Sequence, residues 1–328
     1  MLKVAIYVAE LGGKKVVETK DQILHIESKG KTLEEVNDPV TEADYVSHCA
    51  MYYSLRNIFP QINVISEEHT SKCAIQDNDY DASSADHHAI DRLNDEFVFS
   101  KDVTIWIDPL DATKEYTEGL YQYVTTMVCV AIKGVPVVGV IHYPFASQTY
   151  WGWIPSATSP NIANIVQKEE NKEHPKVVVS ISHAGTVKDL AFEAFGAKTT
   201  VLSAAGAGFK AMGVVNGTYD IYLHTSAIKK WDICAGNAIL NAVNGEMRTT
   251  KGDKIDYTPK DSTDHKVTDG IVATRHHNDY YLKRIIEEMD KKNVYNQKNN
   301  SDARGKTNIG IGIESRAASE VEFRNNPC

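Results

Sequence analysis

The first part of the chain contains two apolar patterns with helical spacing. Residues 3–28 repeat apolar side chains at that spacing, with Gly12 and Gly13 as a weak point. Asn37-Asp38-Pro39 interrupts the pattern, and Thr41 opens a second one that continues to about Phe59. We therefore expect two helices separated by a break in the chain.

Short apolar runs follow and predict strands, because they are rich in β-branched residues and are bounded by turn-forming residues. Lys133-Gly134 lies between two of these runs and predicts a hairpin. The polar stretch 69–95 indicates a surface excursion. The expected strands are residues 62–66, 103–107, 124–133, 136–143 and 150–154.

From Lys176 onward strand and helix patterns alternate, which is typical of an α/β fold. The polar stretch 161–175 predicts a boundary between a subdomain at 1–170 and a second α/β subdomain at 171–292. Residues 293–328 show little hydrophobic pattern and predict a disordered tail. The expected order in the second subdomain is strand 177–180, helix 187–195, strand 199–202, helix 207–215, strand 219–223, helix 231–243, strand 271–273 and helix 279–289.

Composition limits the classes of function. The 328 residues are 42% hydrophobic and carry a formal net charge of −9. This charge argues against a nucleic-acid binder, because such proteins depend on cationic contacts to phosphate. A negatively charged protein that handles phosphate must supply its cations locally, and metal ions are one way to do so.

The number and spacing of the cysteines predict no disulfide framework, and the hydropathy of the chain predicts no membrane-spanning segment. The five cysteines are an odd number without a Cys-x-x-Cys pair, which argues against a disulfide framework and a structural zinc site. Cys129 and Cys234 lie in apolar runs and are expected to be core residues. No stretch reaches the roughly 18 apolar residues of a membrane span, and Met1 opens onto an amphipathic helix rather than a signal peptide.

The segment 106–119, Trp-Ile-Asp-Pro-Leu-Asp-Ala-Thr-Lys-Glu-Tyr-Thr-Glu-Gly, carries the clearest chemistry. An apolar strand delivers Asp108 to its end, where Pro109 stops the pairing. Asp111 follows beside Thr113, at the expected start of a helix. Carboxylates and free helix N–H groups would meet there, which favours divalent cations and a phosphate group. The alternative is a solvated strand end followed by an ordinary N-cap.

Four places in the chain put an acid at the edge of an element. They are Asp44, the Glu67-Glu68 pair, the Asp108 and Asp111 pair, and Asp232. Capping explains some of them separately, because Asp44 can be the N3 acid of a capping box and Asp232 an N-cap. If the acids converge, they form a phosphoesterase site with two or three metal ions, in which an Asp paired with a Thr hydroxyl polarises a water.

These segments resemble the inositol monophosphatase superfamily of Mg²⁺-dependent, Li⁺-inhibited phosphatases. The likeness spans about residues 1–290 and rests on Pro-Val-Thr-Glu-Ala-Asp44, Glu67-Glu68, the Asp108 segment and Trp231-Asp232-Ile-Cys-Ala-Gly. Within it, Ser182-His183 and residues 229–240 are similar to the 3′(2′),5′-bisphosphate nucleotidases, above all to their Golgi-resident branch. The resemblance implies an α/β, layered αβαβα sandwich.

The resemblance also implies a role for each site residue. Glu67, Asp108 and the Leu110 carbonyl would hold a first Mg²⁺, and Asp108, Asp111 and Asp232 a second. Asp44 and Thr113 would orient the attacking water, with Glu68 nearby. The N–H groups of Ala112 and Thr113 would cradle the phosphate, although much of the superfamily has Gly where this chain has Ala112.

The implied reaction is hydrolysis of 3′-phosphoadenosine 5′-phosphate to AMP and phosphate, a step of sulfation metabolism. Ser182, His183 and Lys210 fall where the nucleotidases bind the nucleoside and the 5′-phosphate, or else are ordinary surface residues. Alternatives are an inositol polyphosphate 1-phosphatase and a non-catalytic protein that binds adenosine bisphosphates. A dinucleotide site at Gly206-Ala207-Gly208 is disfavoured, because no acid follows a strand about 20 residues later.

The compartment stays open between the Golgi lumen and the cytoplasm. Asn216-Gly217-Thr218 and Asn299-Asn300-Ser301 are N-glycosylation sequons, compatible with a lumen, but the membrane anchor expected of the Golgi-resident branch is absent. The sequence does not give the oligomeric state.

Overall fold

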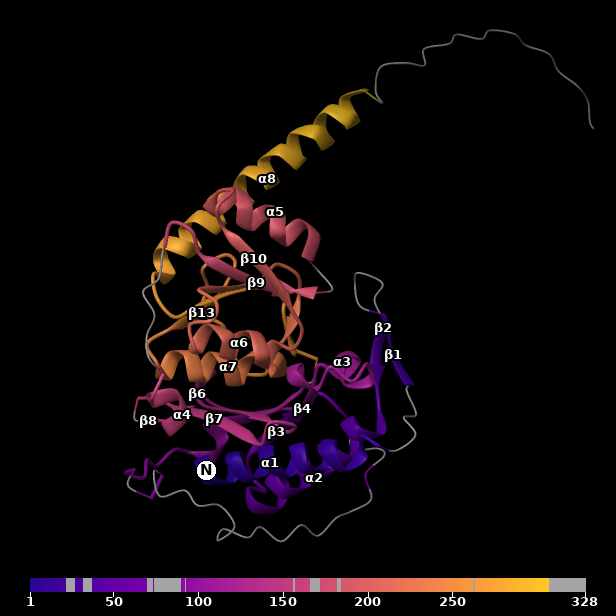
Figure 1. The fold of residues 1–328 in the computed structure, drawn as a ribbon, viewed down its shortest axis with the longest axis vertical. Coiled ribbons are helices and arrows are strands. Elements are labelled where there is room, and N and C mark those ends of the chain that lie inside the picture. The colour runs from indigo at the N-terminus through magenta and orange to yellow at the C-terminus, as the bar shows by residue number, and fades with distance from the viewer. Residues whose placement is uncertain are drawn as a thin grey trace, which may run out of the picture. The chain divides into compact units, whose positions relative to one another are not determined.

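The structure is a computed structural model that describes residues 1–21, 27–31, 37–69, 73, 90–91, 93–155, 157–165, 172–181, 184–261 and 263–306. Met1–Glu288 form one compact unit and Met289–Cys328 a second. The first unit has helical layers alternating with two sheets, so the predicted αβαβα sandwich is confirmed (Figure 1). Most of the polar stretch predicted at 69–95 lies outside the described residues.

Two helices, α1 (Leu2–Thr19) and α2 (Glu42–Ile58), pack on each other and on the first sheet. Both were predicted, although α1 ends earlier than expected. The weak point predicted at Gly12 and Gly13 is wrong, because the helix runs through both. A Cβ on Gly12 would collide with Met51 of α2, and one on Gly13 with the His142 ring. The two glycines therefore allow close packing of α1 on its neighbours.

The first sheet has the order β3-β4-β5-β6-β7-β8. β3 is parallel to β4, and all other neighbours are antiparallel. Lys133 and Gly134 have φ of 50° and 77°, as the predicted tight hairpin between β5 and β6 requires. The strands are β3 (Asn63–Ser66), β4 (Val103–Asp111), β5 (Thr125–Ile132), β6 (Val135–Tyr143), β7 (Gln148–Trp153) and β8 (Ala157–Thr158).

The middle layer consists of α6 (Ala207–Val215) and α7 (Lys230–Ala242), which lie between the two sheets (Figure 1). α7 lies close against β6 and β7, because Gly139 and Gly152 present no side chain to it. The largest hydrophobic cluster fills this layer and includes Trp106, Met127 and Trp231. A second cluster lies between the first sheet and α1 and α2.

The second sheet has the order β10-β9-β11-β15-β13, with β10, β9 and β11 parallel and β15 antiparallel to both of its neighbours. The predicted alternation of strands and helices is confirmed. The elements are β9 (Lys176–Ser180), α5 (Ala184–Phe195), β10 (Thr200–Ala204), β11 (Ile221–His224), β13 (Glu246–Thr249), β15 (Ile271–Thr274) and α8 (Asn278–Lys306). Small elements complete the fold: β1 (Glu27–Lys31), β2 (Asn37–Val40), η2 (Ser100–Asp102), α3 (Thr113–Thr117), η3 (Tyr121–Tyr123), α4 (Pro160–Ala163), β12 (Ile228–Lys229) and β14 (Lys266–Val267).

Two disulfides contradict the expectation of none. Cys49 is bonded to Cys73, and Cys129 to Cys234. The second pair is buried, as predicted for core residues, but it also joins β5 to α7. Its cysteines are 105 residues apart, and only the packing of α7 on β5 brings their Cα atoms to 5.7 Å. Cysteine spacing in the sequence could not reveal that proximity.

The C-terminal helix is longer than predicted. α8 continues to Lys306, whereas the sequence predicted a helix end at Met289 and a disordered tail from 293. No Pro or Gly interrupts the sequence between Met289 and Gly305, so nothing stops the helix there. Residues 307–328 lie outside the described residues, and the subdomain boundary near 170 stays a prediction. None of the described helices combines the length and the apolar character that crossing a membrane would require.

Candidate active site

The site begins with acids where the parallel pairing of β3 with β4 ends. The predicted strand end at Pro109 is wrong, because β4 continues through it to Asp111, although its pairing with β5 is irregular between Asp108 and Asp111. Glu67 follows β3, and its N–H donates to the Ile107 carbonyl of β4 at 3.2 Å. Asp108 is buried in β4, and its Oδ1 accepts from the Leu110 N–H at 3.2 Å. Because the carboxyl ends of these strands lie side by side, the two acids come together.

Asp232 joins them from the start of α7. Glu67, Asp108 and Asp232 each offer a carboxylate oxygen, and the three oxygens all lie within 4.8 Å of one another. Burial raises the pKa of Asp232 well above its ordinary value, and the nearby Glu67 and Asp111 raise it further. Three crowded acids repel one another, and a divalent cation would remove that cost.

Although Lys229 rather than Asp232 is the N-cap residue of α7, contrary to the alternative that the sequence offered, Asp232 still caps that helix. It is the N3 residue of α7, and its Oδ2 accepts from the Lys229 N–H at 3.1 Å. The cap engages only one carboxylate oxygen. The other oxygen can therefore contribute to the acid cluster.

Asp44 shows the same division of its two oxygens. Its Oδ2 accepts from the N–H and the hydroxyl of Thr41, both at 2.7 Å, which completes the predicted capping box of α2. Its Oδ1 accepts from the Thr113 hydroxyl at 2.8 Å. The Thr113 hydroxyl lies 3.2 Å from the Leu110 carbonyl, so its single proton favours the shorter bond to Asp44. Capping and pairing with Thr113 coexist in one side chain.

Asp111 binds the start of α6. Its Oδ1 accepts from the Ala207 N–H at 3.1 Å, and its Oδ2 accepts from the Gly208 N–H at 2.8 Å and the Thr125 hydroxyl at 3.1 Å. Burial raises the pKa of Asp111, although Lys210 and these hydrogen bonds oppose that effect. Asp111 is not in the three-carboxylate cluster found among the described residues, but Oδ1 keeps a lone pair.

The Gly206-x-Gly208 motif makes this contact possible. Gly206 has a φ of 66°, and a Cβ there would lie 2.7 Å from the Tyr123 carbonyl. A Cβ on Gly208 would lie 2.5 Å from the Thr125 hydroxyl. The motif that resembled a dinucleotide turn therefore brings α6 against Asp111, a function that the sequence analysis missed.

Lys210 is not the surface residue that the sequence left open as an alternative. It is 3% exposed, and its ammonium donates to the Gly206 carbonyl at 2.7 Å and lies 5.2 Å from the centre of the Tyr222 ring. Burial lowers its pKa to about 8, while Asp111, Glu115 and Asp232 act in the opposite direction. A buried cation thus lies close to two of the acids.

Ala112 occupies an unusual backbone conformation before α3. Its φ of 70° and ψ of 45° are left-handed, a region that favours Gly. This explains why much of the resembling superfamily has Gly there. Glu68 is buried, while Ser182 and His183 lie outside the described residues. The roles predicted for these residues stay predictions.

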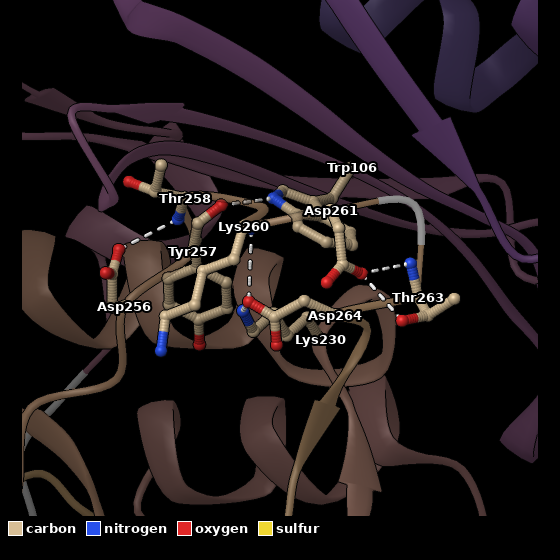
Figure 2. Close-up of polar contacts among 9 residues, drawn as sticks. All are labelled: Trp106, Lys230, Asp256, Tyr257, Thr258, Lys260, Asp261, Thr263 and Asp264. Carbon is tan, nitrogen blue, oxygen red and sulfur yellow. Dashed lines mark hydrogen bonds and ion pairs between the residues drawn. The ribbon is translucent and has the colours of Figure 1, made fainter.

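A loop after β13 fixes the start of α7 against β4. The Trp106 ring nitrogen donates to the Tyr257 carbonyl at 3.1 Å, and the buried Lys230 ammonium pairs with Asp264 at 3.1 Å (Figure 2). Burial alone would raise the pKa of Asp264, but Lys230 and the Lys260 N–H outweigh it and lower the pKa. The Lys230 N–H also donates to the His265 carbonyl at 2.7 Å. These contacts hold the α7 turn that carries Asp232.

The same loop is stabilised by its own short-range bonds. Asp261 accepts from the N–H and hydroxyl of Thr263, and Asp256 accepts from the Thr258 N–H (Figure 2). The sequence gave no signal that this loop supports α7, because its bonds to Trp106 and Lys230 join distant segments.

Comparisons with known proteins give matches over most of the chain. The model of the inositol monophosphatase family matches residues 1–291. The chain is 43% identical over 269 residues to inositol monophosphatase 3 of Xenopus tropicalis, covering 79% of this chain and 73% of that protein. It is 39% identical over 298 residues to the Golgi-resident adenosine 3′,5′-bisphosphate 3′-phosphatase of Rattus norvegicus, covering 89% and 82%.

Solved structures share the fold at lower identity. The suhB protein of Bartonella henselae has a TM-score of 0.64 at 17% identity, covering 86% of this chain and 96% of that one. An inositol monophosphatase from Anabaena has a TM-score of 0.61 at 21% identity, covering 88% and 95%.

Proposed function

This chain belongs to the inositol monophosphatase family, and from that premise we propose that it hydrolyses the 3′-phosphate of 3′-phosphoadenosine 5′-phosphate to AMP and phosphate. Its relatives support the coarser statement that it is a phosphatase of this family, a phosphoric monoester hydrolase. One observation carries the catalytic part of the proposal. It is the cluster of Glu67, Asp108 and Asp232.

The donor set fits Mg²⁺. All available side-chain ligands in the cluster are carboxylate oxygens, which hard cations prefer, and the cluster contains no thiol or imidazole. Of the two or three ions expected, Glu67, Asp108 and the Leu110 carbonyl would hold a first, and Asp108, Asp111 Oδ1 and Asp232 a second. Bound Mg²⁺ would lower the pKa of a water and neutralise charge on the phosphate oxygens. We expect Li⁺ to inhibit.

Asp44 and Thr113 orient the attacking water. Because the Thr113 proton points to Asp44 Oδ1, the hydroxyl oxygen presents its lone pairs to a water. The water can donate to Thr113 as its oxygen attacks phosphorus, and Asp44 takes up the proton through the hydroxyl. Glu68 is a nearby second acceptor, and the N–H groups of Ala112 and Thr113 hold the phosphate.

Substrate choice depends on residues farther from the acids. Ser182 and His183 are assigned to the nucleoside. The buried Lys210 contributes positive charge beside Asp111. We assign it to the 5′-phosphate, which must then reach a side chain that is 3% exposed. A Lys210→Met variant tests this assignment, because loss of a phosphate contact would raise KM for the bisphosphate far more than for a monophosphate.

The test is a side-by-side assay with Mg²⁺. Purified protein is given 3′-phosphoadenosine 5′-phosphate, an inositol monophosphate and inositol 1,4-bisphosphate, and both phosphate and AMP are measured. We expect AMP and phosphate in equal amounts from the first substrate, with loss of turnover in Asp108→Asn. Failure to release AMP would refute the substrate assignment, and failure with all three would refute the site.

A second candidate function is supported by the names of relatives. Relatives 43% identical are named inositol monophosphatase 3, so an inositol phosphate is the competing substrate, and the same assay separates the two. A protein that only binds adenosine bisphosphates is disfavoured, because binding alone does not require a Thr113 hydroxyl bonded to the buried Asp44.

We propose the Golgi lumen as the compartment, with the cytoplasm as the alternative. Relatives are named Golgi-resident, and two disulfides favour an oxidising environment. Fluorescence microscopy of the tagged protein against a Golgi marker tests this. A diffuse cytoplasmic signal would contradict it.

A further inference from the structure

The C-terminal end of α6 carries a sequon that the proposed function leaves unused. α6 ends at Val215, and the next residue, Asn216, caps the helix and is the first residue of Asn216-Gly217-Thr218. Asn216 and Thr218 are both exposed. Gly217 has a φ of 72°, and a Cβ there would meet no atom within 4 Å. The sequon therefore forms a turn that faces open space.

Hydrogen bonding holds the side chain of Asn216 in one orientation. The Thr218 N–H donates to Asn216 Oδ1 at 2.9 Å, which makes an Asx turn. The bond uses the oxygen of the Asn216 carboxamide. The Nδ2 atom, which an oligosaccharide would modify, is the other terminal atom of that carboxamide and takes no part in the bond. The turn thus leaves the reactive nitrogen of the exposed Asn216 outside this hydrogen bond.

The disulfides supply an independent observation. Cys49–Cys73 and Cys129–Cys234 form in oxidising compartments such as the secretory pathway. Asn-linked oligosaccharides are added in the same pathway. A chain that acquires both crosslinks would therefore encounter the transfer machinery with this turn exposed.

We propose that Asn216 carries an Asn-linked oligosaccharide. The donor is a lipid-linked pyrophosphoryl oligosaccharide. A bond forms between Asn216 Nδ2 and the anomeric carbon, the bond from that carbon to the pyrophosphate oxygen breaks, Nδ2 loses a proton, and the lipid pyrophosphate leaves. The modification does not depend on which phosphate ester the enzyme cleaves.

The oligosaccharide would leave the active site open. The first residues of α6 contact Asp111, whereas Asn216 follows the last one. A helix rises about 1.5 Å per residue, so α6 separates the two by roughly 13 Å. We therefore expect phosphatase activity to be unchanged when the oligosaccharide is missing.

The experiment uses the full chain, expressed in animal cells behind a cleavable secretion signal. Asn216→Gln and Thr218→Ala are compared with Thr218→Ser, which keeps the sequon, and with Asn299→Gln at the other sequon. We expect peptide N-glycosidase to convert residue 216 to Asp in the unmodified sequence and in Thr218→Ser, as measured by peptide mass. Asn216→Gln and Thr218→Ala lose that glycopeptide, while Asn299→Gln keeps it.

Recovery of the 216 peptide as unmodified Asn from folded, secreted protein would overturn the proposal. Secretion and phosphatase activity of each variant show that it has folded. Direct peptide mass separates occupancy of residue 216 from occupancy of Asn299, so a glycan at the second sequon does not confuse the result.

Discussion

The acids at strand ends and the acids at helix starts reach the same site by different means. Glu67 follows β3, and Asp108 lies in β4 directly after the last residue that pairs with β3, so the sheet alone brings them together. Asp44 and Asp232 are N3 residues, and each uses Oδ2 to cap its helix. The comparison teaches that a capping explanation does not exclude a catalytic one, because a carboxylate has two oxygens.

The largest expected effect tests the strand-end acids. Asp108→Asn removes one of the three charges of the cluster, and we expect kcat to fall by about a hundredfold or more. The measurement is phosphate release at saturating Mg²⁺, and circular dichroism verifies the fold. Near-normal turnover would show that the cations lie elsewhere. Asp256→Asn, in the supporting loop, is the control and should remain active.

Two threonines that bind the same carboxylate separate catalysis from capping. Thr113→Val removes the hydroxyl at Asp44 Oδ1, and we expect kcat to fall about a hundredfold, as for other losses of acid–base assistance. Thr41→Ala removes the hydroxyl at Oδ2 and should instead cost about 1 kcal/mol of unfolding free energy. The measurements are kcat and urea denaturation of both variants. Equal losses of activity in both variants would refute the proposal that Asp44 Oδ1 serves catalysis and Oδ2 serves capping.

A buried histidine links the two groups of acids and gives a pH prediction. His48 of α2 shares a hydrogen bond of 2.7 Å with the Ser66 hydroxyl of β3. Burial and, to a smaller extent, the charge of His69 lower the pKa of His48 to about 4. Between pH 6.5 and 4 the unfolded chain binds the proton more tightly than the folded chain does. Stability is therefore complete above pH 6.5 and is lost as the pH falls toward 4.

The measurement is Tm between pH 7 and 4. We expect Tm to fall with acidification, and to fall less in His48→Asn. His174→Asn, at an exposed position, should follow the original protein. Identical pH curves for His48→Asn and the original would contradict this assignment.

The smallest expected effect concerns the backbone between the strand-end acids and α3. Ala112→Gly relieves a left-handed conformation, which costs a non-glycine residue about 1 kcal/mol. The added freedom of the unfolded chain partly offsets that gain. We therefore expect a stability change within about 1 kcal/mol and unchanged kcat, measured by denaturation and phosphate release. A large loss of kcat would show that the methyl group itself shapes the site.

Local patterns in the sequence were sufficient for much of the fold. The helices α2 and α7, the β5–β6 hairpin and the later alternation of strands and helices all follow from apolar spacing and turn residues. Strand ends and capping positions also identified Glu67, Asp108 and Asp232 as candidates. Placing these acids together required the resemblance, because no local pattern states which strand ends meet.

What the sequence missed depends on contacts between distant residues. The approach of Gly208 to Thr125, the burial of Lys210 and the pairing of Cys129 with Cys234 all arise from the packing of α6 and α7 between the sheets. Gly206-x-Gly208 gave a visible signal, but a glycine pair does not reveal which neighbour needs the space.

The bond between Cys129 and Cys234 has a mechanical consequence for a site whose proposed metal ligands come from two layers. Asp232 lies two positions before Cys234, so sliding of α7 along β5 would pull its carboxylate away from Glu67 and Asp108. A covalent tie at that point opposes the sliding. Reducing agents should therefore weaken retention of the cations before they unfold the chain.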